Sequence, residues 1–173
     1  QSFAVANDGS VYAWGSNYWG ALGNGTNISS NVPVKVKGLG GTGYLSGIKA
    51  VAAGTSYTLA LANDGSVFAW GGGGYLGNGT NISSNVPVKV KSVDGLGDLS
   101  GITAVAASNE YSLALANDGN IYAWGKSYGG YVNGFETRPE HHLPTIVRFP
   151  RCNDGYLDAA EQCDDGNAFD NDG

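Results

Sequence analysis

The chain has 173 residues, of which 42% are hydrophobic, 14% charged and 11% aromatic. A chain stays disordered when low hydrophobicity is combined with high net charge, so this composition excludes a charge-driven disordered protein. The 29 glycines follow no Gly-X-Y period, which excludes collagen. No apolar run approaches the roughly 18 residues of a membrane span. The composition therefore predicts a turn-rich, all-β protein.

Charge is divided unevenly along the chain. Residues 1–151 contain nine Lys or Arg and eight Asp or Glu, a net charge of +1, whereas residues 152–173 contain seven Asp or Glu and no Lys or Arg. We therefore expect a nearly neutral domain, residues 1–150, followed by an acidic tail module, residues 151–173. Neither part has the basic stripe that duplex nucleic acid requires, so no nucleic-acid partner is expected. Because the chain begins with Gln1 and has no Met, we expect a processed or excised chain.

An internal repeat of about 54 to 56 residues runs through the domain. The block GNGTNISSNVPVKVK is identical at residues 23–37 and 77–91. A second block, LSGIKAVAAGTSYTLAL, opens at Leu45 and returns in a similar form at Leu99. A third block occurs three times and places a tryptophan at the same position each time: Trp14, Trp70 and Trp124. Repetition at this period, with the blocks in constant order, is typical of propellers and solenoids.

The pattern within one repeat predicts four short strands, at residues 48–53, 57–62, 66–70 and 86–91. Asn-Asp-Gly at residues 63–65 predicts a hairpin with a two-residue type I′ turn. Four antiparallel strands in about 50 residues are typical of a β-propeller blade. We therefore expect about three blades, the first without its first strand, at residues 2–37, 48–93 and 102–149.

Residues 2–149 also resemble a known family. The run AVAAGTSYTLALANDGSVFAWG, followed by LGNGT and VPVKV, is similar to the repeat of the regulator of chromosome condensation family. The resemblance implies a β-propeller, usually of seven blades, that serves as a binding scaffold. Three blades cannot close such a ring, and an open array exposes strand edges. We therefore expect either a part of a larger propeller or copies of the chain that complete one another.

The tail resembles a second family. Its sequence, RCNDGYLDAAEQCDDGNAFDNDG, is similar to the start of the cysteine-rich disulfide repeat of bacterial secreted and surface proteins. The resemblance implies that Cys152 and Cys163 form disulfides, with each other or with cysteines beyond Gly173, in an extracellular or cell-surface location. The alternative is two reduced thiols in an acidic linker.

Two sets of aromatic residues are candidates for special roles. The repeated tryptophans follow an alternating strand each time, so we expect Trp14, Trp70 and Trp124 to pack between blades rather than to form a binding platform. Tyr18 and Trp19 interrupt the repeat pattern and fall in a loop. We therefore expect them to be an exposed contact surface.

The sequence indicates no catalytic residue, cofactor or metal site. Residues 72–77 match G-x-G-x-x-G but lead to a strand instead of a helix, so we interpret them as a blade loop. The acidic tail does not have the EF-hand spacing. Adjacent side chains of a strand face opposite ways, so His141 and His142 do not suit one metal, and we expect them in a surface loop.

We therefore expect a non-enzymatic secreted or cell-surface β-propeller module that binds a protein partner or itself. One alternative is a structural subunit of an extracellular assembly that is completed by strand addition between chains. Another is guanine-nucleotide exchange on a small GTPase, an activity that the resemblance to the regulator of chromosome condensation family implies. The residues here match none of the loops that carry that activity, and a fold alone does not transmit function.

Overall fold

The computed structural model describes residues 1–126 and 141–147. These residues form antiparallel β-sheet with two short 3-10 turns, η1 (Leu39–Gly41) and η2 (Gly73–Tyr75). The strands in chain order are β1 (Ser2–Val5), β2 (Val11–Gly15), β3 (Ser30–Lys35), β4 (Ile48–Ala53), β5 (Tyr57–Ala62), β6 (Val67–Gly71), β7 (Ser84–Lys89), β8 (Ile102–Ala107), β9 (Tyr111–Ala116), β10 (Ile121–Gly125) and β11 (His141–Ile146).

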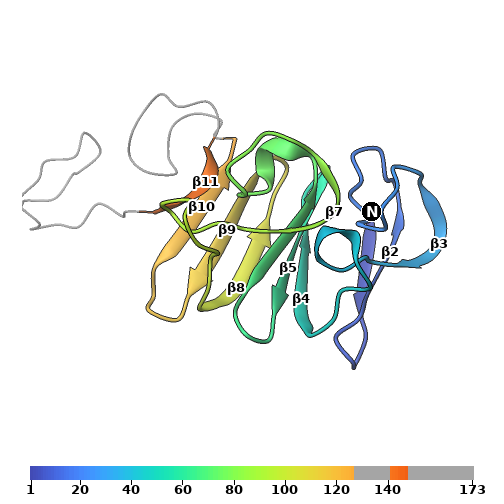
Figure 1. Cartoon of the computed structure of the whole chain (residues 1–173), viewed down its shortest axis with the longest axis horizontal. Coiled ribbons are helices and arrows are strands. Elements are labelled where there is room, and N and C mark those ends of the chain that lie inside the picture. Colours follow the sequence, from blue (N-terminus) through green and yellow to red (C-terminus); the bar gives the residue numbers. More distant parts are fainter. Residues whose placement is uncertain (127–140, 148–173) are drawn as a thin grey trace, which may run out of the picture.

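The strands form three separate sheets that stand side by side like propeller blades (Figure 1). The first blade has the order β1-β2-β3, the second β4-β5-β6-β7 and the third β8-β9-β10-β11. The predicted all-β fold with four-stranded blades is confirmed. β1 corresponds to β5 and β9, the second strands of the other blades. Among the described residues no strand pairs with the free edge of β1, so the first blade has three strands.

Two local predictions are wrong. The hairpin between β5 and β6 has three loop residues instead of two, because Gly65 N–H donates to Ala62 C=O and Ala62 N–H donates to Ser66 C=O. Gly65, at φ +83°, takes the left-handed conformation that closes this loop. The outer strand begins at Ser84, two residues before the predicted start, because Ser84 pairs with Gly71 across a register shift.

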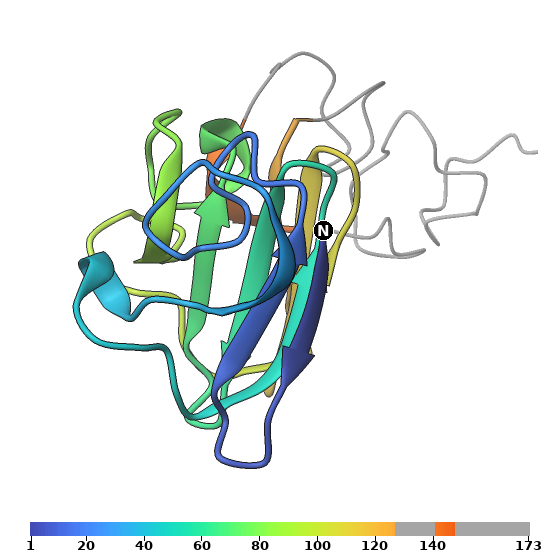
Figure 2. The same cartoon turned by 90° about the vertical axis from the view of Figure 1, so that its right-hand side faces the viewer.

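The hydrophobic core lies between the blades, which stand one behind another in the view along the row of sheets (Figure 2). One cluster joins the first two blades and includes Val11, Leu22, Val36, Ile48 and Trp70. A second cluster joins the second and third blades and includes Tyr57, Leu76, Val90, Ile102 and Trp124. Each interface buries apolar surface that a single sheet would leave in water, so the blades stabilise one another.

The described connections within each blade lie on two opposite faces of the array (Figure 1). We call one the loop face: it carries residues 16–29, 54–56, 72–83 and 108–110. The opposite hairpin face carries the tight turns at residues 6–10, 63–66 and 117–120. No helix in the part of the chain that the structure describes has the length and apolar character needed to cross a bilayer.

Candidate interaction surface

The loop between β2 and β3 is organised around one buried side chain. Asn17 is fully buried, and its amide N–H groups donate to Thr26 C=O at 2.9 Å and Ile28 C=O at 3.1 Å. Its Oδ1 accepts a hydrogen bond from Leu22 N–H at 2.8 Å. Its own backbone N–H donates to Ser29 Oγ at 3.1 Å. These bonds cross the loop in several directions, so Asn17 fixes the shape of residues 16–29.

This loop contains an insertion relative to the next blade. Nine residue steps separate Trp14 from Gly23, whereas seven separate Trp70 from Gly77. The extra length accommodates Tyr18 and Trp19. The residue after them, Gly20, has φ +78°, and a Cβ there would lie 2.6 Å from Asn85 Cα. The loop therefore rests directly on the neighbouring blade, and only glycine permits that approach.

Tyr18 and Trp19 are the aromatic pair of the loop face. Their ring centroids lie 5.5 Å apart with an interplanar angle of 78°, an edge-to-face arrangement. The exposed fractions are 78% for Tyr18 and 51% for Trp19. Ile28, from the other end of the same loop, is also exposed. Large aromatic side chains that a rigid loop holds in water lose little conformational freedom on binding, which is the property of interface anchors.

A groove lies on the same face, between the second and third blades. Its volume is about 380 Å³, and it is lined by Thr55, Ser56, Ser108, Asn109, Glu110 and Tyr111. Thr55 Oγ1 and Asn109 Oδ1 lie 2.8 Å apart, which ties the two loops together. Glu110 accepts a hydrogen bond from Tyr75 Oη at 3.2 Å, and its second oxygen lies 3.8 Å from Lys126 Nζ. The groove offers hydroxyl, amide and carboxylate groups for polar contacts at an interface.

Tyr57 closes the interface beneath this groove. Its hydroxyl donates to Tyr111 C=O and accepts from Ser112 Oγ, and its ring lies 5.4 Å from that of Tyr75. Burial raises the pKa of Tyr57 to about 12. Because the hydroxyl is satisfied by these two neighbours, its role is structural.

The repeated tryptophans differ in their surroundings. Trp70 is buried, and its indole N–H donates to Ala21 C=O of the preceding blade at 2.8 Å. The indole N–H of Trp124 likewise donates to Tyr75 C=O of the preceding blade at 3.0 Å. Trp14 is only half-buried. No described residue accepts a hydrogen bond from its indole N–H in the way that Ala21 C=O does for Trp70 and Tyr75 C=O does for Trp124. Trp70 and Trp124 therefore join neighbouring blades, whereas the face of the first blade at Trp14 is open.

The remaining predicted positions fall into two groups. His141 and His142 belong to β11, so the prediction of a surface loop is wrong; His142 C=O accepts a hydrogen bond from Gly79 N–H at 2.8 Å, which holds this strand against the preceding blade. Cys152 and Cys163 lie outside the described residues, together with the tail. Within residues 1–126 and 141–147, no group of three His, Cys, Asp or Glu has the arrangement of a metal site.

The sequence matches a known family model over two consecutive repeats. The model of the regulator of chromosome condensation (RCC1) repeat matches residues 8–61 and 64–115. The chain belongs to the RCC1 repeat family. A second RCC1 repeat model matches residues 48–75 and 102–130.

Individual relatives of this RCC1 repeat chain are much longer than it is. It is 33% identical over 156 residues to the human E3 ubiquitin-protein ligase HERC2, a match that covers 89% of this chain and 3% of HERC2. The Arabidopsis thaliana ultraviolet-B receptor UVR8 is 27% identical over 148 residues, covering 84% of this chain and 32% of UVR8.

Solved structures share the fold. Human WBSCR16 is similar with a TM-score of 0.69 and 27% identity, covering 86% of this chain and 37% of WBSCR16. Prp20p of Saccharomyces cerevisiae, described with its binding to Gsp1p and histones, has a TM-score of 0.65 and 22% identity, covering 85% and 36% of the two chains. The chain thus spans about a third of the length of these propellers, and at 22% identity the likeness to Prp20p shows the fold alone.

Proposed function

We propose that this chain is a non-enzymatic protein-interaction module of a secreted or cell-surface protein and that it binds its partner through the loop face. An RCC1-repeat propeller fits a protein-interaction module in general. The observation that supports this particular surface is the aromatic pair, Tyr18 and Trp19, which a buried asparagine holds in solvent.

The physical argument rests on the cost of exposing these rings. Two adjacent aromatic side chains in water forgo a hydrophobic gain of about 1.5 to 3 kcal/mol each, which burial in an interface recovers. The insertion that carries them is absent from the next blade, so the fold itself does not need it. The groove on the loop face adds polar groups for a hydrogen-bonded periphery.

The extracellular location is supported by the tail alone. The resemblance of residues 151–173 to a disulfide repeat implies an oxidising compartment, in which Cys152 and Cys163 are paired. Protein partners are known for structural relatives: the yeast protein Prp20p is described with binding to Gsp1p and histones. For this chain we expect a protein partner.

The test is the capture of a partner by the full chain and by two variants. Tyr18→Ala/Trp19→Ala removes the aromatic pair, whereas Leu96→Ala removes an exposed side chain from the connection between β7 and β8, outside the loop face. Partners captured from the source organism's extracellular fraction are then titrated against each purified chain. We expect the double variant to lose about 10-fold or more in affinity and the control to stay within 2-fold. Equal affinities for all three chains would contradict the proposal.

A structural role in an assembly is the second candidate, and the open first blade favours it. β1 exposes three of its four residues, and its free edge has no partner strand among the described residues. A strand from another chain could add there. Native mass spectrometry distinguishes the two roles: regular oligomers of the full chain would support assembly, and a monomer at micromolar concentration would exclude it.

Guanine-nucleotide exchange remains a third alternative, which rests on likeness of fold alone. It predicts faster release of GDP from a small GTPase when the full chain is added. Unchanged release would remove it.

A further inference from the structure

The described part of the chain contains two Asn-Gly pairs, at residues 24–25 and 78–79. Both pairs belong to the block that is identical at residues 23–37 and 77–91. The two glycines have φ +84° and +83°, a conformation that glycine adopts without strain. Asn-Gly is also the pair whose side-chain amide deamidates most readily, because glycine has no side chain to shield its backbone nitrogen. The turn that the fold needs in each blade therefore carries a chemically labile amide.

Deamidation begins at the glycine nitrogen. This nitrogen loses its proton and attacks the side-chain carbonyl carbon of the preceding asparagine. A new C–N bond forms, ammonia leaves, and the cyclic succinimide that results is opened by water to aspartate or isoaspartate. Water is the only co-reactant, so the rate depends on how freely the glycine nitrogen can approach the amide.

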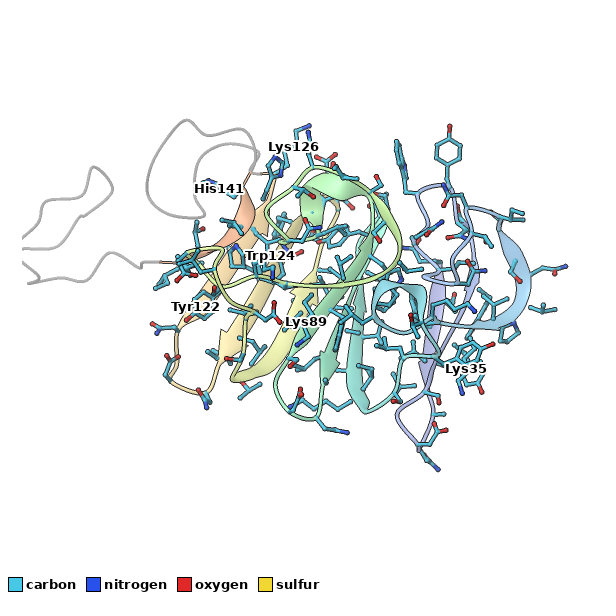
Figure 3. The ribbon with its side chains drawn as sticks, in the orientation of Figure 1. Lys35, Lys89, Tyr122, Trp124, Lys126 and His141 are labelled. Carbon is cyan, nitrogen blue, oxygen red and sulfur yellow. The ribbon has the colours of Figure 1, made fainter. Side chains whose placement is uncertain are left out.

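In the folded chain both glycine nitrogens are hydrogen-bonded across a junction between blades. Gly25 N–H donates to Asn85 C=O at 2.9 Å, and Gly79 N–H donates to His142 C=O at 2.8 Å. The two acceptors lie on β7 and β11, the outer strands of the following blades; His141, the first residue of β11, is labelled in Figure 3. A nitrogen whose proton is held by a carbonyl is a poor nucleophile, so attack requires the two blades to part at this point.

The side-chain amides are held as well. Asn24 Oδ1 accepts hydrogen bonds from the backbone N–H of Thr26 at 3.1 Å and from its hydroxyl at 2.9 Å. Asn78 Oδ1 accepts the same two bonds from Thr80, both at 3.1 Å. These bonds fix the orientation of each amide, which must turn toward the glycine nitrogen before the ring can close.

The first blade holds its amide with one more bond than the second. Asn17 Nδ2 also donates to Asn24 Oδ1, at 3.3 Å. Gly73 takes the place of Asn17 in the second blade, because the backbone N–H of each donates to the serine hydroxyl at the far end of its loop. Since Gly73 has no side chain, Asn78 lacks the third bond. We therefore expect Asn78 to be the more reactive of the two.

The repeated tryptophans close the same junctions. A Cβ on Gly23 would lie 2.7 Å from Trp70 Nε1, and a Cβ on Gly77 would lie 2.7 Å from Trp124 Nε1. Trp124 lies where the second and third blades meet (Figure 3). Gly23 and Gly77 immediately precede the two labile asparagines. Each tryptophan therefore holds one Asn-Gly turn and leaves the other to its own junction.

We propose that Asn24 and Asn78 are deamidation sites that the docking of neighbouring blades protects. When a junction opens, the glycine nitrogen is released and the succinimide forms. Isoaspartate lengthens the backbone by one carbon between the two glycines that flank the site, so the turn no longer fits the tryptophan on one side and the strand carbonyl on the other. The modification thus marks chains whose blades have separated. It does not depend on the loop-face function proposed above.

The rates of deamidation in the full chain test this protection. The chain is incubated at mildly alkaline pH in buffer and in guanidinium chloride, and mass spectrometry follows the tryptic peptides that contain Asn24 and Asn78. Because the two sites have identical flanking sequences, both should react at one rate in the denatured chain. In the folded chain we expect both rates to fall about 10-fold or more, with Asn78 faster than Asn24. Equal rates in buffer and in denaturant would overturn the proposal.

Two matched variants test the role of each junction. Trp70→Phe and Trp124→Phe keep an aromatic ring but lose the indole N–H that donates to the preceding blade. Trp70→Phe should speed the reaction of Asn24 about 5-fold and leave Asn78 unchanged, and Trp124→Phe should do the reverse. Circular dichroism confirms that both variants are folded. If one variant sped both sites, or neither, protection by the individual junction would be disproved.

Discussion

Replacement of the repeated tryptophans by alanine measures how strongly neighbouring blades stabilise each other. Trp70 is fully buried, its ring lies edge-to-face with Phe3 at 6.3 Å, and its indole N–H donates to Ala21 C=O. Removing such a side chain from a core costs about 3–5 kcal/mol of unfolding free energy. Trp14 occupies the equivalent position but is half-buried, so Trp14→Ala should cost about 1 kcal/mol.

The assay is urea denaturation of the full chain followed by far-ultraviolet circular dichroism, because loss of an indole would confuse a fluorescence signal. We expect Trp70→Ala to be less stable than Trp14→Ala by roughly 3 kcal/mol, which is a factor of more than 100 in the unfolding equilibrium. Trp70→Phe should lie between them, since Ala21 C=O still accepts a hydrogen bond from Thr58 Oγ1 at 3.0 Å. If Trp14→Ala and Trp70→Ala lost the same unfolding free energy, the inference that contact with the preceding blade makes Trp70 the more stabilising residue would be refuted.

Three further predictions address the loop, the blade interface and the tail. Asn17→Ala should lower the unfolding free energy by about 2–3 kcal/mol and speed amide exchange in residues 18–29, because their hydrogen bonds to the buried amide are lost; unchanged exchange would contradict this. Since the pKa of Tyr57 is about 12 in the folded chain and about 10 in an unfolded one, its neutral form favours folding, and stability should fall as pH rises from about 10 to 12. In Tyr57→Phe the unfolding free energy should depend less on pH between about 10 and 12. A pH dependence identical to that of the wild-type chain would show that the buried Tyr57 hydroxyl is not its cause. Alkylation of the non-reduced full chain should find no free thiol at Cys152 or Cys163, and a labelled cysteine would disprove the disulfide.

Much of the fold could be predicted from the sequence because the repeat imposes it. The inner strands Ile48–Ala53 and Tyr57–Ala62 coincide with the predicted residues. Their apolar runs end at a Gly-Thr-Ser break and at an Asn-Asp-Gly turn, and both are strong local signals. The outer strand was harder to place, because Ser84 pairs with Gly71 across a register shift that depends on contacts between strands and leaves no pattern within either.

The candidate surface could be predicted only in part. The insertion at Tyr18 and Trp19 is visible by comparing repeats, and it indicates an exposed loop. The role of Asn17 was missed, because an asparagine in a loop looks the same whether it is buried or exposed.

The most direct test of the loop-face proposal is site-specific photo-cross-linking on both faces of the array. A photoreactive amino acid replaces Ile28, an exposed residue of the loop that carries Tyr18 and Trp19, in one full-length chain and Asp64 on the hairpin face in another, and each chain is exposed to the extracellular fraction of the source organism. We predict that one protein cross-links at position 28 at least 10-fold more strongly than at position 64. Equal cross-linking from both faces, or none at position 28, would contradict a partner-binding loop face.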